Sequence, residues 1–260
     1  MKLPVMFSRS VDNAHFLARC YRYRLRTEKL QIKTLMKLRL SGASVLDVGA
    51  NKGIYCYWLT QAVGGTGRVL AVEPQPEMFA GIEQLTRRFG WTNLQALNFC
   101  LSDTEGTSIL SRERVGDGSA SLEQMRHRGE DEKLVVKTIR LDDISHALSN
   151  LKYIKCDVEG HELKVFLGGE RTIRQHRPIV QFESTVGDDN TFRIFDFFRS
   201  LGYQGVMLLG NEYHDYTTLM RKRHYKFGLE GHRDFLFFPP EALATTIPPK
   251  LAKQFLLASK

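Results

Sequence analysis

Short apolar runs alternate with longer amphipathic stretches along most of this chain. The short runs predict buried strands, and the amphipathic stretches predict the helices that cover them. Strands are expected at residues 44–48, 68–73, 94–101, 134–141, 151–156, 178–183, 205–209 and 234–238, and helices at 51–65, 77–89, 162–173 and 191–201. Because strands and helices follow one another in turn, the pattern predicts an α/β fold with a mainly parallel sheet and helices on both faces.

The alternation divides the chain into three parts. Residues 1–40 are predicted to form a basic helical leader, residues 41–240 the α/β domain, and residues 241–260 a C-terminal tail. Within the domain, the polar and glycine-dotted stretch 104–132 is too long for an ordinary connection. We expect it to be a partly ordered insertion or a lid.

Composition narrows the class of protein. A chain of 260 residues with 42% apolar content can bury roughly three quarters of its unfolded surface in one large domain. No apolar run is long enough to cross a membrane, and the first residues do not form a signal peptide. The four cysteines are far apart and form no C-x-x-C pair, which predicts reduced thiols and a cytoplasmic location.

The net charge of +8 belongs to the leader. Residues 1–40 contain ten Lys and Arg but only two acids, Asp12 and Glu28, whereas the rest of the chain is balanced. One interpretation is a solvated helical face that packs on the domain through Leu30, Leu35 and Leu38. The other is contact with an anionic surface such as nucleic acid, a membrane or an acidic glycan. We favour the first.

Acidic residues recur at the ends of successive predicted strands. In an open α/β sheet, ligands bind outside the carboxyl ends of the strands, so these side chains are expected to converge. Burying several carboxylates together is costly without a partner that offers positive charge or hydrogen-bond donors. S-adenosylmethionine has a sulfonium, an ammonium, two ribose hydroxyls and an adenine amine. The acids are Asp47, Glu73, Asp103, Asp157 and Glu183.

The stretch 45–53 predicts where such a cofactor would bind. It reads as a buried strand, a tight turn and the start of a helix, with Gly49 and Gly53 allowing close approach of a ligand to the backbone. We expect these glycines to contact the amino acid part of the cofactor and Asp47 to receive its ammonium. The D-x-G-x-x-x-G spacing differs from the dinucleotide fingerprint G-x-G-x-x-G, which argues against a nicotinamide-dependent dehydrogenase.

Two further positions are candidates for cofactor binding. Glu73 is placed to accept the ribose hydroxyls, although it could instead cap the helix that follows Pro74. Ser102 and Asp103 are placed to bond the adenine edge, but Ser102 is nearly as well explained as an ordinary turn residue.

The ordered motifs resemble those of the FkbM family of methyltransferases over residues 44–184. The motifs are D-V-G-A-N-K-G at 47–53, E-P at 73–74, L-S-D at 101–103, T-I-R-L-D-D at 138–143 and I-K-C-D-V-E-G-H-E at 154–162. The resemblance implies S-adenosylmethionine as methyl donor and a Rossmann-like sheet of seven strands in the order 3-2-1-4-5-7-6, with strand 7 antiparallel. It also places Asn51 and Pro74 in the cofactor site. The implied acceptor is a hydroxyl on a sugar, a glycolipid or a secondary metabolite.

An alcohol needs a base or a metal ion to become a good nucleophile. The candidates for this role are Asp157, Glu159, His161 and Glu183. His161 could equally be a surface residue at a helix start. Asp157, Glu159 and Glu183 could hold a divalent cation, although no spacing demands one. Lys155 is expected on the same face as Asp157, where it would pair with a carboxylate.

The leader keeps one alternative open. It could guide a nucleic-acid methyltransferase or a nucleic-acid-binding module. The chain has no (N/D)-P-P-(Y/F) block for methylating base amines, so we consider nucleic acid an unlikely partner and a small-molecule or saccharide-like acceptor the better prediction.

Overall fold

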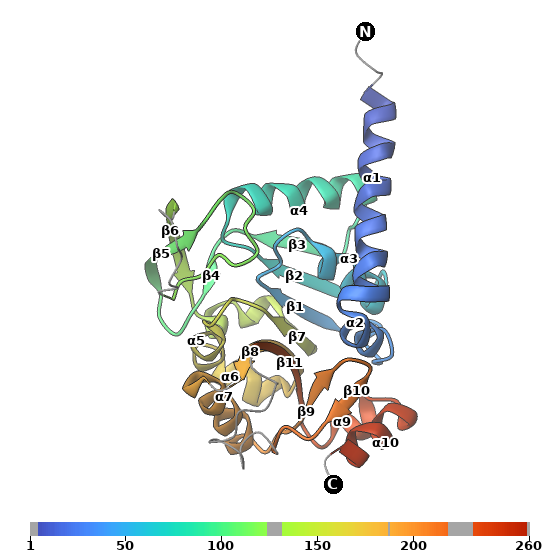
Figure 1. The fold of residues 1–260 in the computed structure, drawn as a ribbon, viewed down its shortest axis with the longest axis vertical. Helices are drawn as coiled ribbons and strands as arrows, with labels where there is room; N and C mark the ends of the chain where they lie inside the picture. Colours follow the sequence, from blue (N-terminus) through green and yellow to red (C-terminus); the bar gives the residue numbers. More distant parts are fainter. Residues whose placement is uncertain (1–4, 124–131, 187, 218–230, 259–260) are drawn as a thin grey trace.

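The computed structural model describes residues 5–123, 132–186, 188–217 and 231–258, and its centre is an eight-stranded sheet (Figure 1). The strand order is β10-β9-β11-β8-β7-β1-β2-β3. The bounds are β1 (Ser44–Val48), β2 (Arg68–Val72), β3 (Leu94–Leu97), β7 (Leu151–Cys156), β8 (Ile179–Val186), β9 (Gln204–Leu209), β10 (Glu212–His214) and β11 (Gly231–Phe238). The strands from β3 to β8 in this order are parallel, while β11 runs antiparallel to β8 and β9.

This arrangement confirms the predicted fold and strand order. Without β10, the sheet has the expected seven strands in the order 3-2-1-4-5-7-6, with the antiparallel strand in seventh place along the chain. The short strand β10 adds an eighth, antiparallel member at the edge beside β9.

Helices cover both faces of the sheet because neighbouring residues of each strand point to opposite sides. Val45 packs in the cluster that also contains residues of α1 to α4, α9 and α10, whereas Leu46 packs in the cluster with α5 to α7. The bounds are α1 (Val5–Arg22), η1 (Tyr23–Thr27), α2 (Lys29–Leu35), α3 (Ile54–Val63), α4 (Pro76–Phe89), η2 (Leu141–Asp143), η3 (Ser145–Ala147), α5 (Glu162–Leu167), α6 (Glu170–His176), α7 (Asp189–Ser200), α9 (Ala242–Thr245) and α10 (Pro249–Ala258). None of the helices that the structure describes is long and apolar enough to cross a membrane.

A second, three-stranded sheet lies on the far side of the molecule from α1 (Figure 1). It contains β4 (Cys100–Leu101), β5 (Gly106–Arg112) and β6 (Glu132–Ile139). The predicted single strand 94–101 is therefore wrong. It breaks because the side-chain amide of Asn98 donates to the carbonyls of Glu73 and Pro74, at 2.9 and 3.0 Å, which turns the chain toward β6.

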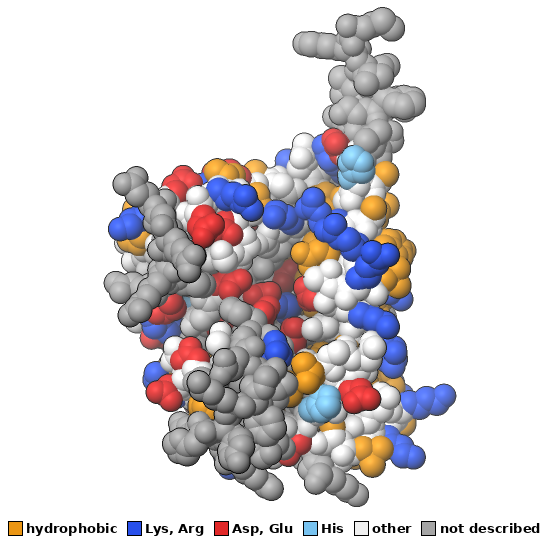
Figure 2. All heavy atoms as spheres, in the orientation of Figure 1, with side chains coloured by type: hydrophobic (Ala, Val, Ile, Leu, Met, Phe, Trp, Pro, Cys, Tyr) orange, Lys and Arg blue, Asp and Glu red, His pale blue; other side chains and the backbone are white. Residues whose placement is uncertain are grey.

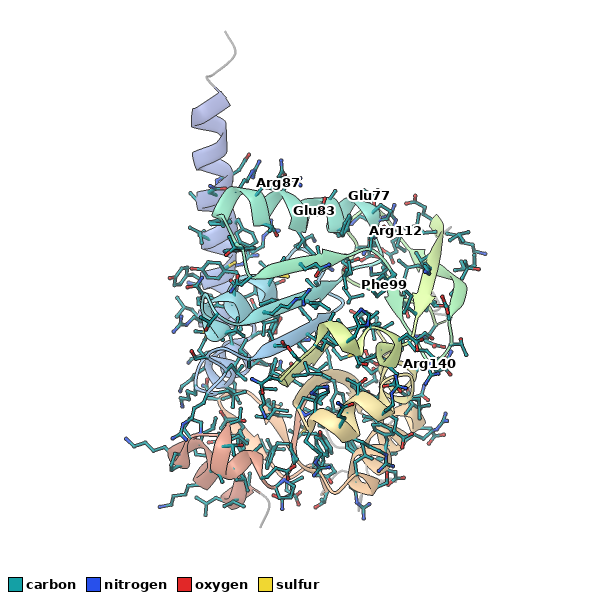
Figure 3. All side chains as sticks on the ribbon, turned by 180° about the vertical axis from the view of Figure 1, so that it is seen from behind. Glu77, Glu83, Arg87, Phe99, Arg112 and Arg140 are labelled. Carbon is teal, nitrogen blue, oxygen red and sulfur yellow. The ribbon has the colours of Figure 1, made fainter. Side chains whose placement is uncertain are left out.

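The second sheet also corrects the prediction for residues 104–132. Their first part forms β5, which pairs antiparallel with β6, and residues 124–131 lie outside the described part of the chain. Arg112 at the end of β5 is almost fully buried and reaches Glu77 at the start of α4 (Figure 3). The insertion is thus held to the main domain by charge as well as by apolar contacts.

The predicted helix 162–173 is also divided. It ends at Leu167 and restarts at Glu170 because the backbone at Gly168 passes very close to the carbonyl of Ser102. A Cβ atom at Gly168 would lie 1.9 Å from that oxygen. A Cβ atom at Gly169 would likewise lie 2.6 Å from Cδ2 of Leu141. The two glycines therefore allow this helical segment to pack against the second sheet.

The N-terminal residues pack on the domain through apolar side chains. Leu30, Leu35 and Leu38 are buried in the same cluster as Val45 of β1, as the packing interpretation of the leader predicts. Cys20 of α1 is buried there too. Among the basic side chains of this segment that the structure describes, Arg24 is half-buried over the ring of Trp58 and the others are exposed, with Arg19 and Arg22 at the rim of the site described next.

Candidate active site

Two adjoining hollows lie at the carboxyl ends of β1, β2 and β7. They share Gly49, Asn51, Gly118 and Asp157. The first hollow is also lined by Val48, Val72, Glu73, Pro74, Gln75, Phe99, Cys100, Leu101, Leu110, Ala120, Leu122, Val158, Glu159 and His161. The second is also lined by Arg19, Arg22, Tyr23, Glu28, Asp47, Ala50, Lys52, Ile54, Tyr55 and Lys155. Together they reach from the second sheet to the end of α1.

The turn after β1 forms the shared edge of the hollows. Gly49 has a φ of +80°, and a Cβ atom there would lie 1.9 Å from the carbonyl oxygen of Asp157. Glycine is therefore required because two strand ends meet at this point, in addition to any approach of a ligand. Gly53, with a φ of +74°, precedes the first residue of α3 and lines neither hollow.

Glu73 organises the first hollow from the end of β2. Its carboxylate accepts the backbone N–H of Asn51 at 2.7 Å and that of Gln75 at 2.9 Å. Burial raises the pKa of Glu73 to about 7, although the two N–H groups act in the opposite direction. Each carboxylate oxygen has a further lone pair, so this residue can also accept hydroxyl groups of a ligand.

Apolar side chains form the opposite wall of the first hollow. Phe99 (Figure 3) and Leu101 come from the segment that leaves the main sheet. Leu110 and Leu122 come from the inserted region. Such a wall suits a flat heteroaromatic ring. Ser102 and Asp103 are not among the lining residues of either hollow, so their predicted contact with adenine stays a prediction.

The hydroxyl of Ser102 contacts a histidine instead. Its Oγ lies 3.0 Å from Nε2 of His161 and 3.1 Å from Asp103 Oδ1. Nδ1 of His161 lies 2.8 Å from Glu123, and burial lowers the pKa of His161 despite that carboxylate. Both ring nitrogens are therefore engaged, and the imidazole joins the inserted region to the turn after β7.

Glu162 fixes that turn, and Glu159 lies within it. Glu162 accepts the N–H groups of Val158 and Gly160, at 3.0 and 3.3 Å, and burial raises its pKa to about 7. Glu159 has a φ of +51°, and burial together with Asp157 raises its pKa to about 7. The turn therefore holds Asp157 and Glu159 at the edge of the first hollow.

A buried lysine underlies the shared edge. Lys155 Nζ donates to Asp157 at 2.9 Å and lies 5.1 Å from the ring centre of Tyr55. Burial alone would lower the pKa of Lys155, but the carboxylates of Asp157, Asp234 and Glu28 outweigh it and raise this pKa. The predicted pairing of Lys155 with a carboxylate is present, and it orients Asp157 toward both hollows.

The second hollow contains acids on its floor and basic residues at its rim. Figure 2 shows red side chains gathered inside the hollow at the centre of this face and blue ones along the side formed by α1. Asp47 is buried, contacts the thiol of Cys56 at 3.4 Å, and has its pKa raised to about 6 by burial. The hydroxyl of Tyr55 donates to Glu28, whose pKa burial raises to about 7.

A hydrogen-bonded network extends from this floor to the last strand of the sheet. Gln181 donates to Tyr55 at 3.0 Å and to Asp234 at 3.1 Å, and it accepts the hydroxyl of Tyr153 at 2.6 Å. Gln31 of α2 donates to Asp234 at 2.7 Å. These partners were not predicted from the sequence. A sequence signal existed only for Glu28, an isolated acid in a basic segment.

Comparison with known proteins gives the family. Residues 47–204 match the sequence model described as "Methyltransferase FkbM domain", which is more than half of the chain. The chain belongs to the FkbM methyltransferase family. No curated protein matches this FkbM chain.

Several solved structures resemble this FkbM protein at low sequence identity. The FkbM methyltransferase from Methylobacillus flagellatus KT is 18% identical with a TM-score of 0.50, covering 77% of this chain and 45% of its own. A precorrin-6y C5,15-methyltransferase from Geobacter metallireducens is 15% identical, covers 80% of this chain and 85% of its own, and has a TM-score of 0.46. A SAM-dependent methyltransferase from Aquifex aeolicus is 14% identical, covers 86% of this chain and 96% of its own, and has a TM-score of 0.43. The present chain thus spans less than half of the Methylobacillus protein.

The predicted site residues of this FkbM protein are only partly brought together. Of the predicted set, those that line the hollows are Asp47, Gly49, Asn51, Glu73, Pro74, Asp157, Glu159 and His161. Glu183 lines neither hollow and lies opposite Asp234 on β11, where burial and Asp157 raise its pKa to about 8. Within the described residues, no three His, Cys, Asp or Glu side chains are grouped to hold a metal ion, so the divalent-cation possibility is not supported.

Proposed function

We propose that this FkbM protein transfers a methyl group from S-adenosylmethionine to a hydroxyl of a saccharide-like or small-molecule acceptor. The observation that supports this most directly is the shared edge of the two hollows. Asp157 stands on that edge, between a hollow with a carboxylate and apolar side chains and a hollow lined mainly by charged and polar side chains. A donor and an acceptor bound in the two hollows would meet beside this carboxylate.

The residues present fit the proposed cofactor. The adenine ring would lie against Phe99 and Leu101, and Glu73 would accept the ribose hydroxyls. The buried carboxylate of Asp47 is available for the ammonium. When bound, S-adenosylmethionine supplies a methyl group that an oxygen nucleophile can attack.

Asp157 is our candidate for the proton acceptor. An alcohol reacts faster when a positioned base removes its proton, and the oxygen must be held in line with the reacting carbon. Asp157 lines both hollows, and Lys155 fixes its orientation from below. We assign His161 a positioning role, because its two nitrogens hold Ser102 and Glu123. Glu159 and Glu183 stay candidates for tuning how readily the carboxylate of Asp157 accepts a proton.

Titration calorimetry with S-adenosylhomocysteine tests the cofactor site. We expect saturable binding, and Glu73→Ala should weaken the affinity by at least about tenfold. This is the loss of binding free energy that one to two hydrogen bonds contribute. Glu83→Ala on the exposed face of α4 is the matched control and should bind like the wild type. Absence of saturable binding in the wild-type protein would overturn the proposal.

Incubation with methyl-labelled cofactor and fractionated cell extract tests the acceptor class. Label in a saccharide or small-molecule fraction is expected, and Asp157→Asn should abolish it while retaining cofactor-product binding within a few-fold. Label in RNA would instead favour the nucleic-acid alternative.

A further inference from the structure

Three basic side chains at the rim of the second hollow have no acidic partner. Arg19, Arg22 and Lys52 line the hollow, and none forms an ion pair with a carboxylate among the residues that the structure describes. Of the three floor carboxylates, Asp47 contacts the thiol of Cys56 and is the one proposed for the ammonium of the cofactor, and the other two are already engaged. Asp157 pairs with Lys155, and Glu28 accepts the hydroxyl of Tyr55. Within the described part of the chain, the rim therefore carries positive charge that no ion pair neutralises.

The end of α1 presents these arginines to the hollow together. Arg19 and Arg22 are three residues apart on a helix, so their side chains project to the same side. A π-turn follows at once, in which the N–H of Glu28 donates to the carbonyl of Tyr23 at 2.9 Å. Because of this turn, Tyr23 and Glu28 both line the hollow although they are five residues apart. Single π-turns inside helices are frequent at functional sites.

The proposed cofactor accounts for only part of this charge. Lys52 lies in the turn after β1, so its ammonium is available for the carboxylate of the cofactor. Arg19 and Arg22 come from α1, outside the residues 47–204 that match the family. Their position belongs to this chain's own N-terminal segment and not to the shared cofactor motif.

We propose that Arg19 and Arg22 bind a carboxylate or phosphate group of the acceptor, which makes the acceptor an anionic saccharide or a similar anionic hydroxyl compound. Guanidinium groups match these anions with paired hydrogen bonds, and two on one face can hold a single group from both sides. Tyr23 offers an aromatic side chain beside them for the body of such a compound. This inference rests on the proposed function, because it assigns the α1 side of the second hollow to the acceptor, while Asp47 and Lys52 on its β1 side face the cofactor.

Ligand binding to the full-length protein saturated with S-adenosylhomocysteine tests this assignment. The probes are D-glucuronate, glucose 6-phosphate and glucose, titrated at one fixed ionic strength so that screening is equal. We expect at least one anionic sugar to bind about tenfold or more tightly than glucose, since a charged hydrogen-bonded pair contributes that much. Which anionic probe binds more tightly then distinguishes carboxylate from phosphate.

The matched variants are Arg19→Gln with Arg22→Gln, and Arg26→Gln with Lys29→Gln. Both pairs remove two exposed charges from the leader, but Arg26 and Lys29 do not line the hollow. The first pair should lose the preference for the anionic sugar while its affinity for S-adenosylhomocysteine stays within about twofold of the wild type. The Arg26/Lys29 pair should keep both the preference for the anionic sugar and the affinity for S-adenosylhomocysteine.

Three results would overturn the inference. Glucose could bind as tightly as both anionic sugars, the control pair could lose the preference equally, or the Arg19/Arg22 pair could lose the affinity for S-adenosylhomocysteine, which would assign the arginines to the cofactor. Failure of the wild-type protein to bind S-adenosylhomocysteine at all would be a separate result, because it rejects the proposed function itself.

Discussion

Several carboxyl groups at the site are buried and hold their protons more tightly than exposed acids do. Burial raises the pKa of Glu28, Glu73 and Glu162 from the ordinary 4.5 to about 7. Because these pKa values are raised, the folded state binds more protons than the unfolded state between pH 4.5 and about 7. The stabilising contribution is complete below pH 4.5 and is lost as the pH rises through about 7.

The free energy of unfolding should therefore be higher at pH 5.5 than at pH 8. We expect a difference of at least about 1.4 kcal/mol, the equivalent of one pKa unit, although the lowered pKa of His161 acts in the opposite direction. Urea unfolding at the two pH values measures it. Glu162→Gln should reduce the difference, whereas Glu83→Gln on exposed α4 should leave it unchanged. Equal stability of the wild type at both pH values would contradict this reading of the buried acids.

At the scale of single residues, the sequence supplied the acids but not their partners. Asp47 lies in a buried strand, Glu73 and Asp157 follow buried strands, and the parallel sheet brings these three to the hollows. The other two of the five predicted acids, Asp103 and Glu183, line neither hollow. Ser102 could not be placed, because its neighbours depend on the bend at Asn98. Asp234 was also missed as a partner of Gln31, since the two are 203 residues apart in the chain.

At the scale of elements, the second sheet depends on one buried arginine. Arg112 of β5 donates to both carboxylate oxygens of Glu77 on α4, at 2.8 and 3.1 Å, and to Glu132 on β6 at 2.9 Å. These hydrogen bonds join two strands and a helix that are separate in sequence. Leu110 of the same strand lines the first hollow, so this contact also positions the wall of the proposed adenine site.

Arg112→Met should loosen the second sheet without unfolding the domain. We expect a loss of about 1–3 kcal/mol, because the bonds to a charged side chain are lost while the half-exposed acids can be solvated. Hydrogen exchange should quicken in β5 and β6 and stay unchanged in β1. Arg87→Met is the control on α4, since its pair with Glu83 is exposed and 3.7 Å apart. Uniform acceleration across the main sheet would refute a local role for Arg112.

The boundaries of elements were less predictable than their existence. The strand 94–101 contains Asn98, and the helix 162–173 contains Gly168 and Gly169, all disfavoured inside such elements, but the apolar residues on both sides of them favoured continuous elements. The breaks come from distant groups, the carbonyls of Glu73 and Pro74 in one case and that of Ser102 in the other. Local patterns cannot contain such contacts because they depend on the finished tertiary structure.

At the scale of the whole molecule, we propose that the leader is part of the domain's core. Leu35 is fully buried, whereas Leu25 of the same segment is 64% exposed. Leu35→Ala should lower the free energy of unfolding by about 2–5 kcal/mol, the usual cost of a cavity in a packed core. Leu25→Ala, the matched control, should change it by no more than about 0.5 kcal/mol. Chemical unfolding measures both, and equal small effects would show that the leader is only attached to the surface.

The strand order of the sheet followed from the family motifs, because the fold of the shared part is common to the family. The second hollow did not follow from them. Arg19 and Arg22 of its rim come from α1, and Gln31 and Asp234 of its supporting network come from α2 and β11, which all lie outside the matched residues.

The network around Asp234 sets the order in which the site can be completed during synthesis. A nascent chain emerges from its N-terminus, and Asp47, Glu73 and Asp157 are all available before β11 has been made. Gln31 and Gln181 must wait for Asp234, and β8 and β9 cannot join until β11 is inserted between them. The newborn protein therefore gains the residues that would hold the methyl donor first, and the floor of the acceptor side is closed only after β11 has followed them out of the ribosome.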